Sequence, residues 1–411
     1  RDEFAALTIA EVGATESLCQ GAQLDGPIEI VRYYAELVKT YPMTEDLGNI
    51  ESRGMQHHRW VEKEAAGVVA AIIAYNYPNQ LALAKLAPAL AAGCTVVLKS
   101  APDTPLVTLA LGELIANHTD IPDGVVNVLS GTDPAVGAAL TTSPDVDMVT
   151  FTGSTGVGRS IYGRVGPHRR VQLEMGGKNP VVVADDADPE RAAALIVKGA
   201  FGLSGQACTG TSRVIATDAV HDELVERVVA RAQALRVGPG AQAGIDMGAL
   251  ASAEQLAKFV SYVQIGTTEG ARLRCGGSTV DVPGHDGGFF AQPTVFTDTT
   301  PSMRIVTDEV FGPLLAFQRA GSLREAIELA NATEYGLSAS IITGDLAVAQ
   351  TFVRESRTGL VKVNQPTTGM AMNAPFGGYK ASSTATFKEQ AGPSMMEFYL
   401  TEKTVYLNSA S

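Results

Sequence analysis

Apolar runs followed by amphipathic stretches recur along the first half of this chain. Residues 67–73 form a continuous apolar run, as a strand covered on both faces requires, and leucines with helical spacing follow at residues 81–90. The same order recurs three times, with strands predicted at 94–98, 125–129 and 148–151 and helices predicted from about 105, at 136–140 and after 158. This alternation predicts a parallel, doubly wound α/β sheet.

The same alternation starts again near Glu174. Residues 180–184 predict a buried strand, and residues 189–199 predict the helix that follows it. The series continues with strands at 212–216, 339–343 and 359–364 and with helices at 222–234 and 253–263. We therefore expect a second α/β domain.

Peripheral elements are expected at both ends of the chain. Apolar residues with helical spacing predict one helix within residues 4–12 and another from Pro27 to about Tyr41, because Pro42 cannot continue it. Residues 47–65 and 398–407 lack helical periodicity and predict extended strands. Because the sequence starts at Arg1, inside a predicted amphipathic helix and not in a signal peptide, we expect a further segment upstream.

Composition and charge narrow the classes of function. The 411 residues are 45% hydrophobic and 18% charged, which excludes general disorder and favours more than one domain. With 31 basic against 44 acidic residues the net charge is −13, and without a long basic run no nucleic-acid partner is expected. The longest uncharged stretch, 65–84, contains Asn76, Pro78, Asn79 and Gln80, which would be costly inside a membrane.

Cysteine usage indicates the compartment. The four cysteines, Cys19, Cys94, Cys208 and Cys275, show no CxxC spacing. They fit a reducing compartment better than a disulfide framework. We therefore expect a soluble, cytoplasmic protein without a metal site.

A glycine-rich turn follows the strand predicted at 148–151. Residues 153–158 read GSTGVG and open a helix, where backbone N–H groups and the helix dipole can bind a phosphate. The outer glycines stand five positions apart, so the turn is not the G-x-G-x-x-G fingerprint of a dinucleotide site. From these residues alone, phosphate binding and a plain glycine-rich turn both stay open.

Three other positions could carry chemistry, and each has a plainer interpretation. Cys208 lies in the small-residue loop GQACTG, as an accessible nucleophile or as an inert buried thiol. Glu174 precedes a double-glycine turn and could act as a general base or be a surface carboxylate. Asn76 follows a buried strand and could donate to a developing oxyanion or form an Asx turn.

Together and in this order, the motifs resemble those of the aldehyde dehydrogenase superfamily. The matching segments run across nearly the whole chain: Tyr75–Pro78, Lys99 within KSAPDTPL, Phe151–Gly158, EMGGKNP from Glu174, GQACT around Cys208, Glu309–Pro313, Asn364, and Pro375–Gly378 followed by Lys380. The resemblance implies two doubly wound, Rossmann-like α/β domains and a small β oligomerisation domain. The implied boundaries are 1–46 and 66–174 for dinucleotide binding, 175–381 for catalysis, and 47–65 and 395–411 for the oligomerisation strands.

The resemblance also implies catalytic roles. Cys208 is similar to the nucleophile that attacks the aldehyde carbon, and Asn76 with the Cys208 N–H would form the oxyanion hole. Glu174 matches the general base that activates water to hydrolyse the thioester, which favours release of a carboxylic acid over acylation of coenzyme A. Glu389 matches an acid that assists proton relay, and Lys178 lies near the turn after Glu174; both could equally be structural.

Cofactor contacts follow from the same resemblance. The residues assigned to the NAD or NADP site are Gly153 and Ser154 against the pyrophosphate, Gly158 for close helix packing, Lys99 on the adenosine ribose, Glu309 and Phe311 at the nicotinamide ribose and ring, and Tyr75 where many members have Trp or Phe. NAD-preferring members usually carry a glutamate three residues after the lysine, where this chain has Pro102 and then Asp103. Loss of that carboxylate removes a charge that would repel a 2′-phosphate, so NADP becomes possible. Asp103 could take the place of the missing carboxylate and restore a preference for NAD. We favour NAD as the cofactor.

Substrate and partners are less defined. The implied substrate is a small aldehyde in a tunnel lined by residues such as Tyr77, Leu81, Ala84, Ala207, Thr209 and Phe376. Residues 363–369 and 387–390 are similar to the branch that contains α-ketoglutarate semialdehyde dehydrogenases, although no arginine stands at these tunnel positions, and Arg159 and Arg213 are interpreted as surface or structural. Exposed strand edges imply a homodimer or homotetramer. A coenzyme-A-acylating enzyme and a catalytically silent structural protein remain as alternatives.

Overall fold

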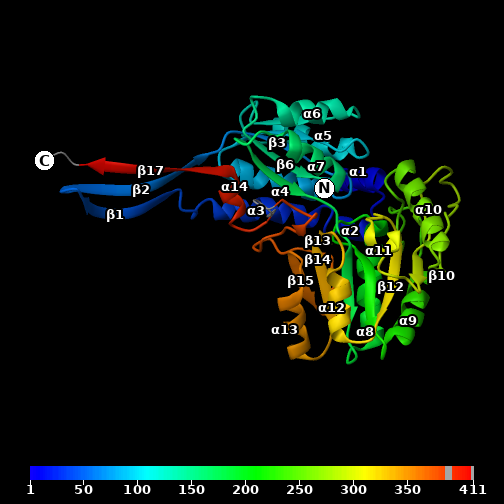
Figure 1. Ribbon diagram of the computed structural model, residues 1–411. Helices are drawn as coiled ribbons and strands as arrows, with labels where there is room; N and C mark the ends of the chain where they lie inside the picture. The colour runs from blue at the N-terminus through cyan, green and yellow to red at the C-terminus, as the bar shows by residue number, and fades with distance from the viewer. Residues whose placement is uncertain (385–390, 409–411) are drawn as a thin grey trace.

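The fold is described by a computed structural model that covers residues 1–384 and 391–408. Two α/β lobes, each with its own central sheet, lie one above the other, and a three-stranded sheet projects from the upper lobe (Figure 1). The upper lobe holds a five-stranded sheet and the lower lobe a seven-stranded sheet. This architecture confirms the expected pair of doubly wound sheets with a smaller β element.

The five-stranded sheet is parallel and has the order β5-β4-β3-β6-β7. Its strands are β3 (Val68–Ile72), β4 (Thr95–Lys99), β5 (Val126–Leu129), β6 (Met148–Thr152) and β7 (Arg170–Glu174). The helices between them are α4 (Pro78–Ala91), α5 (Pro105–His118), α6 (Pro134–Thr142) and α7 (Thr155–Arg164). The order reverses at β3, so the carboxyl ends of β3 and β6 form the position where open α/β sheets bind ligands.

The beginning of α7 corrects the sequence-based boundary. The helix was expected after Gly158 but begins at Thr155, because the Ser154 hydroxyl accepts a hydrogen bond from Val157 N and caps the first turn. Glycines at 156 and 158 are tolerated inside this helix, and Gly158 is required because a Cβ there would approach Met175 Sδ to 2.4 Å. The glycine-rich turn is therefore largely the first turn of a helix.

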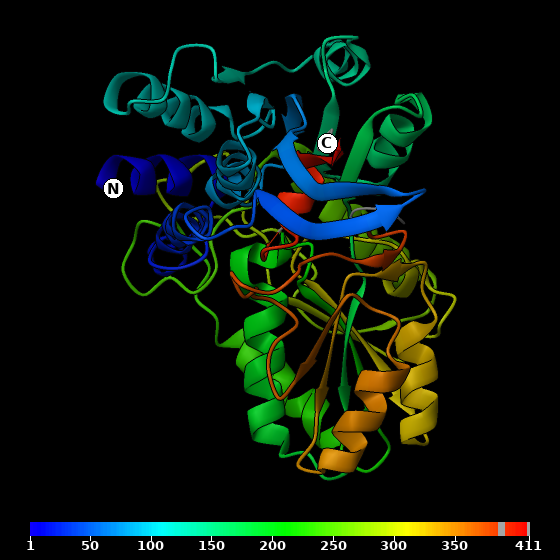
Figure 2. The same cartoon turned by 90° about the vertical axis from the view of Figure 1, so that its left-hand side faces the viewer.

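The seven-stranded sheet has the order β10-β11-β12-β9-β8-β14-β15, and only β10 is antiparallel to its neighbour among the described strands. Its strands are β8 (Asn179–Val183), β9 (Thr211–Thr217), β10 (Arg272–Cys275), β11 (Thr294–Thr297), β12 (Leu314–Ala320), β14 (Ser338–Ile342) and β15 (Leu360–Val363). The helices are α8 (Pro189–Phe201), α9 (His221–Gln233), α10 (Ala253–Thr268), α11 (Arg304–Thr307), α12 (Leu323–Asn331) and α13 (Leu346–Glu355). Figure 2 shows α8 and α9 on one side of the sheet and α12 and α13 on the other.

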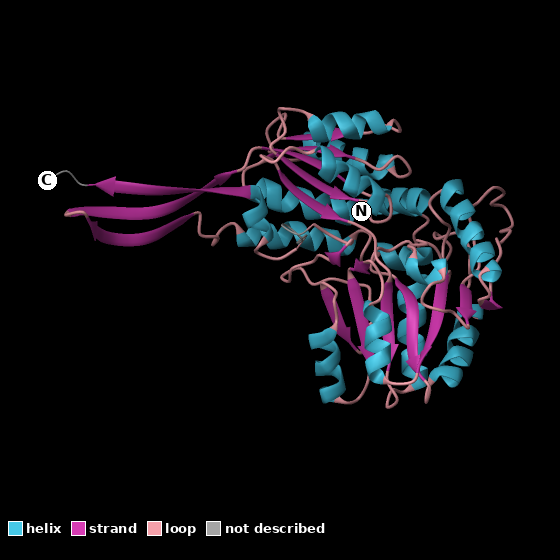
Figure 3. Ribbon diagram, in the orientation of Figure 1, coloured by secondary structure: helices cyan, strands magenta, loops and turns pink. Residues whose placement is uncertain are grey.

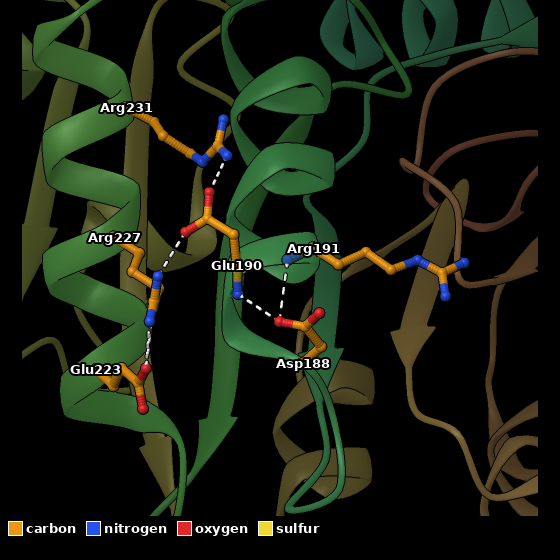
Figure 4. Close-up of polar contacts among 6 residues, drawn as sticks. All are labelled: Asp188, Glu190, Arg191, Glu223, Arg227 and Arg231. Carbon is orange, nitrogen blue, oxygen red and sulfur yellow. Dashed lines mark hydrogen bonds and ion pairs between the residues drawn. The ribbon is translucent and has the colours of Figure 1, made fainter.

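Surface charges join α8 to α9. Arg227 Nη1 donates to Glu190 Oε2 at 2.6 Å and Arg227 Nη2 to Glu223 Oε1 at 2.7 Å, while Arg231 pairs with the other oxygen of Glu190 (Figure 4). Asp188 caps α8 by accepting from Glu190 N at 2.9 Å. These solvent-exposed pairs add modestly to the apolar contact between the two helices.

The projecting sheet contains β1 (Thr44–Ser52), β2 (Met55–Ala65) and β17 (Leu400–Asn408), all antiparallel (Figure 3). Residues 395–399, expected to be extended, form the short helix α14 (Met395–Tyr399), because Met395, Met396, Phe398 and Tyr399 pack into the core of the upper lobe. The remaining elements are α1 (Asp2–Val12), α2 (Glu16–Cys19), α3 (Asp25–Leu37), the 3-10 helix η1 (Gly202–Gly205), β13 (Tyr335–Gly336) and β16 (Tyr379–Lys380). Helix α3 ends four residues before the expected Tyr41, since a turn over residues 38–40 precedes Pro42.

Candidate active site

A pocket of about 750 Å³ lies at the carboxyl ends of the strands of the five-stranded sheet. Its lining comes from the turns after β3, β4, β6 and β7, from α6 and α7, and, in the other lobe, from Cys208, Thr209, Glu309, Phe311 and α10. Parallel strands direct their carboxyl ends to one edge, so residues far apart in the sequence meet there. The pocket therefore has residues from both lobes in its walls.

Cys208 occupies a tight turn between η1 and β9. Gly210 N donates to Ala207 O at 2.8 Å, which closes a four-residue turn with Cys208 in its second position. The side chain is half-buried and lines the pocket. Burial raises the pKa of Cys208 to about 12; Glu309 and Glu174 add to the rise, whereas the N–H groups of Thr209 and Cys208 lower it. At neutral pH the group in the pocket is the thiol.

Asn76 lies in the turn between β3 and α4 and is 3% exposed. Its side-chain Nδ2 donates to Gln206 O at 2.8 Å, and its own carbonyl accepts from Gln23 Nε2 at 2.7 Å. A carboxamide has two N–H donors, so the bond to Gln206 leaves one for a ligand in the pocket that Asn76 lines.

Glu174 ends β7 and is 2% exposed, so the surface interpretation is wrong. Its Oε1 lies 3.5 Å from Ser383 Oγ, and within the described residues its Oε2 has no hydrogen-bond partner. Burial raises the pKa of Glu174 well above its ordinary value, against the charge of Lys85 and the Ser383 hydroxyl. A buried carboxyl oriented into the same pocket as Cys208 can exchange protons with groups there.

The glycine-rich turn and α7 form one wall of the pocket. Gly153, Ser154, Gly156 and Val157 line it, and the helix presents its amino-terminal turn to the cavity. A Cβ on Gly153 would approach the Phe151 ring to 2.5 Å, so the close packing of this turn requires glycine there.

Glu309, Phe311 and Tyr75 line the same pocket and interact with one another. Glu309 Oε1 accepts from Gly177 N at 3.0 Å, and the Tyr75 and Phe311 rings meet edge to face with centroids 5.8 Å apart. Burial raises the pKa of Glu309, while Gly177 N–H, Lys258 and Lys178 lower it. Phe311 has a φ of 58°, a left-handed conformation that a bulky residue adopts only where its surroundings impose it.

Lys99 and its neighbours line another part of the pocket. Lys99 Nζ donates to Ser100 O at 3.0 Å and to Gly131 O at 3.3 Å. Pro102 and Asp103 also line the pocket, and burial together with Glu254 raises the pKa of Asp103. Asp103 thus presents a carboxyl group in the pocket wall, beside Pro102.

Other expected positions lie elsewhere. Tyr77, Leu81, Thr209 and Phe376 line the pocket, but Ala84 faces the core of the upper lobe and Ala207 lines a second, small cavity. Lys178 is 2% exposed and is not in the pocket wall; burial lowers its pKa to about 7. Glu389 lies outside the described residues.

Arg213 and Arg159, which the sequence analysis interprets as structural or surface residues, make contacts of that kind. Arg213 is 1% exposed and donates to Lys178 O, Leu329 O and Ala330 O at 3.1, 2.9 and 2.9 Å. Arg159 pairs with Glu334 at the surface at 2.8 Å. Both therefore serve the fold.

Several pocket residues were missed from the sequence: Gln80, Arg164, Gln255, Lys258, Thr368, Gly369 and Met370. Lys258 lowers the pKa of Glu309 more than Lys178 does. A lysine on the polar side of α10 resembles any solvated surface lysine, so the sequence carried no signal for it. The loop at 368–370 lay within a recognised segment, but its contact with the pocket depends on the fold.

The described residues contain neither a candidate metal-binding cluster nor a candidate membrane-spanning helix. Across residues 1–384 and 391–408, no group of three or more His, Cys, Asp or Glu side chains could hold a metal ion. None of the helices in this part of the chain is long and apolar enough to cross a membrane.

Comparison with known proteins identifies the family. The family model described as "Aldehyde dehydrogenase family" matches residues 1–405. An α-ketoglutarate semialdehyde dehydrogenase of Haloferax volcanii is 40% identical over 99% of this chain and 83% of its own length, and an α-ketoglutaric semialdehyde dehydrogenase of Bacillus subtilis is 38% identical over 99% and 82%. A crystal structure of Staphylococcus aureus betaine aldehyde dehydrogenase in complex with NAD+ superposes with a TM-score of 0.92, at 33% identity over 99% of this chain and 79% of that one. The chain belongs to the aldehyde dehydrogenase family.

Proposed function

We propose that this chain oxidises an aldehyde to a carboxylic acid through a covalent intermediate on Cys208, with NAD or NADP as hydride acceptor. The observation that carries the proposal is that Cys208, Glu174 and Asn76, from three separate segments, line one pocket with the amino-terminal turn of α7. A thiol, a buried carboxyl group and an amide donor are the groups that acyl transfer through a thioester needs.

A dinucleotide fits the residues in the pocket. The amino-terminal turn of α7, with Gly153 and Ser154, would provide backbone N–H groups for a pyrophosphate, Lys99 would hydrogen-bond the adenosine ribose, and Glu309 would provide a carboxylate for ribose hydroxyls. The structural relative from S. aureus was solved with NAD+, which supports the same class of cofactor here. When bound, the cofactor supplies the nicotinamide ring that accepts a hydride. We favour NAD over NADP, because an ionised Asp103 beside Pro102 would repel a 2′-phosphate.

The protein groups then act in order. The Cys208 thiol transfers its proton to solvent water, and the resulting Sγ thiolate forms a bond to the aldehyde carbon; the carbonyl π electrons move to the oxygen, which becomes an alkoxide held by Asn76 Nδ2 and the Cys208 N–H. After the hydride has left this carbon, the acyl group remains on Sγ as a thioester. Glu174 takes a proton from a water molecule, the hydroxide adds to the thioester, and the carbon–sulfur bond breaks to release the acid and the thiolate.

The two alternatives are weaker. Glu174, placed in the pocket with Cys208, favours hydrolysis over transfer of the acyl group to coenzyme A. A catalytically silent structural role would not require a buried carboxyl in the same pocket as a cysteine, with one oxygen that no described residue hydrogen-bonds. Stimulation by coenzyme A, with an acyl-coenzyme A product, would favour the first alternative.

Among aldehydes, we propose a semialdehyde of a 2-oxo acid as the first candidate. The support is the similarity to the H. volcanii and B. subtilis enzymes, which are named for α-ketoglutarate semialdehyde. The end of the pocket around Cys208 is lined by Tyr77, Gln80, Leu81, Thr209, Thr368 and Phe376. These side chains are neutral, so hydrogen-bond donors and not an ion pair would hold a carboxylate there.

We also propose the division into domains and an oligomer. The five-stranded sheet ends at Glu174 and the seven-stranded sheet begins at Asn179, which supports the boundary near 174. The projecting sheet exposes Leu47, Ile50, Met55, Tyr406 and Leu407. Exposed apolar side chains on open strands favour burial against another subunit, as a dimer or tetramer, which sedimentation velocity would test.

The direct test is absorbance of the reduced nicotinamide on mixing the protein with an aldehyde panel, once with NAD and once with NADP. We expect turnover with one cofactor and none from Cys208→Ala, which should still bind that cofactor. Turnover by Cys208→Ala would refute the covalent mechanism. Absence of turnover with every aldehyde and both cofactors would refute the proposed activity if α-ketoglutarate semialdehyde is in the panel.

A further inference from the structure

Asn179, at the start of β8, makes three hydrogen bonds with its buried side chain. Nδ2 donates to Cys208 O and to Gly210 O, both at 2.8 Å, and Oδ1 accepts from Ser338 N at 3.0 Å. The residue is 2% exposed. Both donors of the carboxamide are therefore used on the turn that carries the cysteine, and its acceptor is used on the neighbouring strand β14.

The local backbone explains why a side chain makes these bonds. Strand β8 lies between β9 and β14, and its register with β9 shifts between Asn179 and Pro180. Pro180 has no N–H to donate to a neighbouring strand. The side chain of Asn179 thus links both neighbouring segments at the place where the backbone ladder is irregular.

The Cys208 turn is packed closely against this point. A Cβ on Gly177 would lie 2.5 Å from Cys208 O and 2.8 Å from Asn179 Oδ1, so only glycine allows the approach. On the other side of the turn, Asn76 Nδ2 holds Gln206 O at 2.8 Å. The peptide unit between Gln206 and Ala207 and the one between Cys208 and Thr209 are therefore held from two directions.

The orientation of one peptide unit affects the sulfur directly. The carbonyl of Cys208 and the N–H of Thr209 belong to the same trans peptide and point in opposite directions. Asn179 holds that carbonyl, and the opposite end of the same peptide, the N–H of Thr209, lies on the side of the Cys208 sulfur and lowers the pKa of the thiol. Glu309 and Glu174 disfavour the thiolate, and Tyr77, the other titratable group that interacts with it, stays neutral because burial raises its pKa.

We propose that Asn179 is a positioning residue for the nucleophile: by holding the Cys208 carbonyl, it directs the Thr209 N–H at the Cys208 sulfur and so promotes formation of the thiolate. This inference rests on the proposed role of Cys208 but adds a residue that touches neither substrate nor cofactor. Its effect should be visible in thiol reactivity without any turnover.

The test is the rate at which iodoacetamide alkylates Cys208, followed by mass spectrometry from pH 6 to pH 10. Modification of Cys19, Cys94 and Cys275 is counted separately in the same spectra. For Asn179→Ala we expect a rate about 10-fold lower at pH 8 and a pH profile displaced upward by about one unit, the size expected for one hydrogen bond to a charged acceptor. Asn331→Ala is the matched control. Asn331, at the end of α12, also links two backbone segments, with one bond donated from Nδ2 to Glu355 O at 2.9 Å and one accepted by Oδ1 from Arg357 N at 2.8 Å.

The outcomes separate positioning from general stabilisation. In steady-state assays, Asn179→Ala should lower kcat while the aldehyde KM and the cofactor Kd stay within about 2-fold, because the lost interaction acts on the nucleophile. An alkylation profile that superposes on those of the wild type and Asn331→Ala would overturn the proposal even if the protein oxidises aldehydes. If Asn179→Ala does not fold, Asn179→Ser, which keeps one hydroxyl donor, is compared in the same way. If both fail to fold while Asn331→Ala folds, the side chain serves the whole fold and the proposal is wrong.

Discussion

Asn76 and Gln206 are joined by a hydrogen bond of 2.8 Å from the Asn76 side-chain amide to the Gln206 carbonyl. The bond connects the turn after β3 in one lobe to the loop before Cys208 in the other. Gln206 is itself held, because its Oε1 accepts from Ala251 N at 3.0 Å. The proposed oxyanion donor is therefore fixed relative to the cysteine before any aldehyde binds, as preorganised stabilisation requires.

Replacing Asn76 with Ala should remove one donor to the alkoxide. We expect kcat/KM to fall by about 10²- to 10³-fold, as for loss of one oxyanion-hole donor. Stopped-flow measurement of cofactor reduction gives the rate, and alkylation of Cys208 provides the control. A loss of alkylation as large as the loss of turnover would show that the amide positions the cysteine and does not stabilise the alkoxide.

Replacing Glu174 with Gln should separate the two halves of the reaction. The carboxamide keeps the shape of the side chain but cannot take a proton from water, so the thioester should accumulate. We expect a burst of reduced cofactor close to one equivalent per active site, followed by turnover at least about 10²-fold slower than in the wild type. Rapid-quench mass spectrometry should detect the acyl group on Cys208, and an absent burst would contradict a role confined to hydrolysis.

The pH dependence of the wild type follows from the raised pKa of Cys208. Because that value is about 12, the thiolate fraction should grow with pH throughout the accessible range. In the absence of cofactor, the alkylation rate should rise about 10-fold per pH unit between pH 7 and pH 10. A plateau near neutral pH would mean that another group stabilises the thiolate in solution.

Glu174 should also make stability depend on pH. Its pKa in the folded protein is raised by burial, so folding favours the protonated carboxyl. The stabilisation is complete below the ordinary carboxyl pKa and is lost as pH rises through the raised folded value. Tm should therefore fall from pH 5 towards alkaline pH more steeply in the wild type than in Glu174→Gln, and parallel Tm curves from differential scanning fluorimetry would contradict this.

Gly176→Ala should disturb cofactor binding specifically. A Cβ at this position would lie 2.2 Å from Glu309 Oε2, so the carboxylate must move away from its place beside Gly177 N. If Glu309 holds a ribose, the cofactor Kd should rise about 10-fold, the loss of roughly one hydrogen bond to a charged group. Gly163→Ala, in the open space at the end of α7, is the control, and an unchanged Kd in Gly176→Ala would remove Glu309 from the cofactor site.

The sequence predicted the strands with long apolar runs and the residues that carry chemistry, because both are local signals. Strands β10, β11 and β12 were not predicted, whereas β5 and β15, which have four residues each like β10 and β11, were predicted, so strand length alone does not explain the difference. Ala84 was expected in the tunnel and lies in the core. Helix α4 is buried on nearly every side, so its apolar pattern does not show which side faces the pocket.

Contacts between segments far apart in the sequence were not predictable from it. Asn179 stood in the recognised segment EMGGKNP, yet its bonds reach residues 29 and 159 positions away along the chain. Lys258 enters the pocket only because α10 lies beside the loop that carries Glu309. Such contacts depend on how the strands, loops and helices of the lower lobe are arranged in space, which no local pattern encodes.

Residues 395–408 complete the fold of the upper lobe, whose other elements lie within residues 1–174. Residues 400–408 pair with residues 57–65, and the side chains of α14 fill the core beside α4. On the ribosome, the upper lobe therefore exposes apolar surface, and one edge of β2 lacks its neighbouring strand, until residues 395–408 have been made. The lower lobe has its whole sheet between residues 179 and 363, so it can fold first. Synthesis from the amino terminus should thus leave the earlier-made half of the protein as the last to reach its native state, and the more dependent on chaperones.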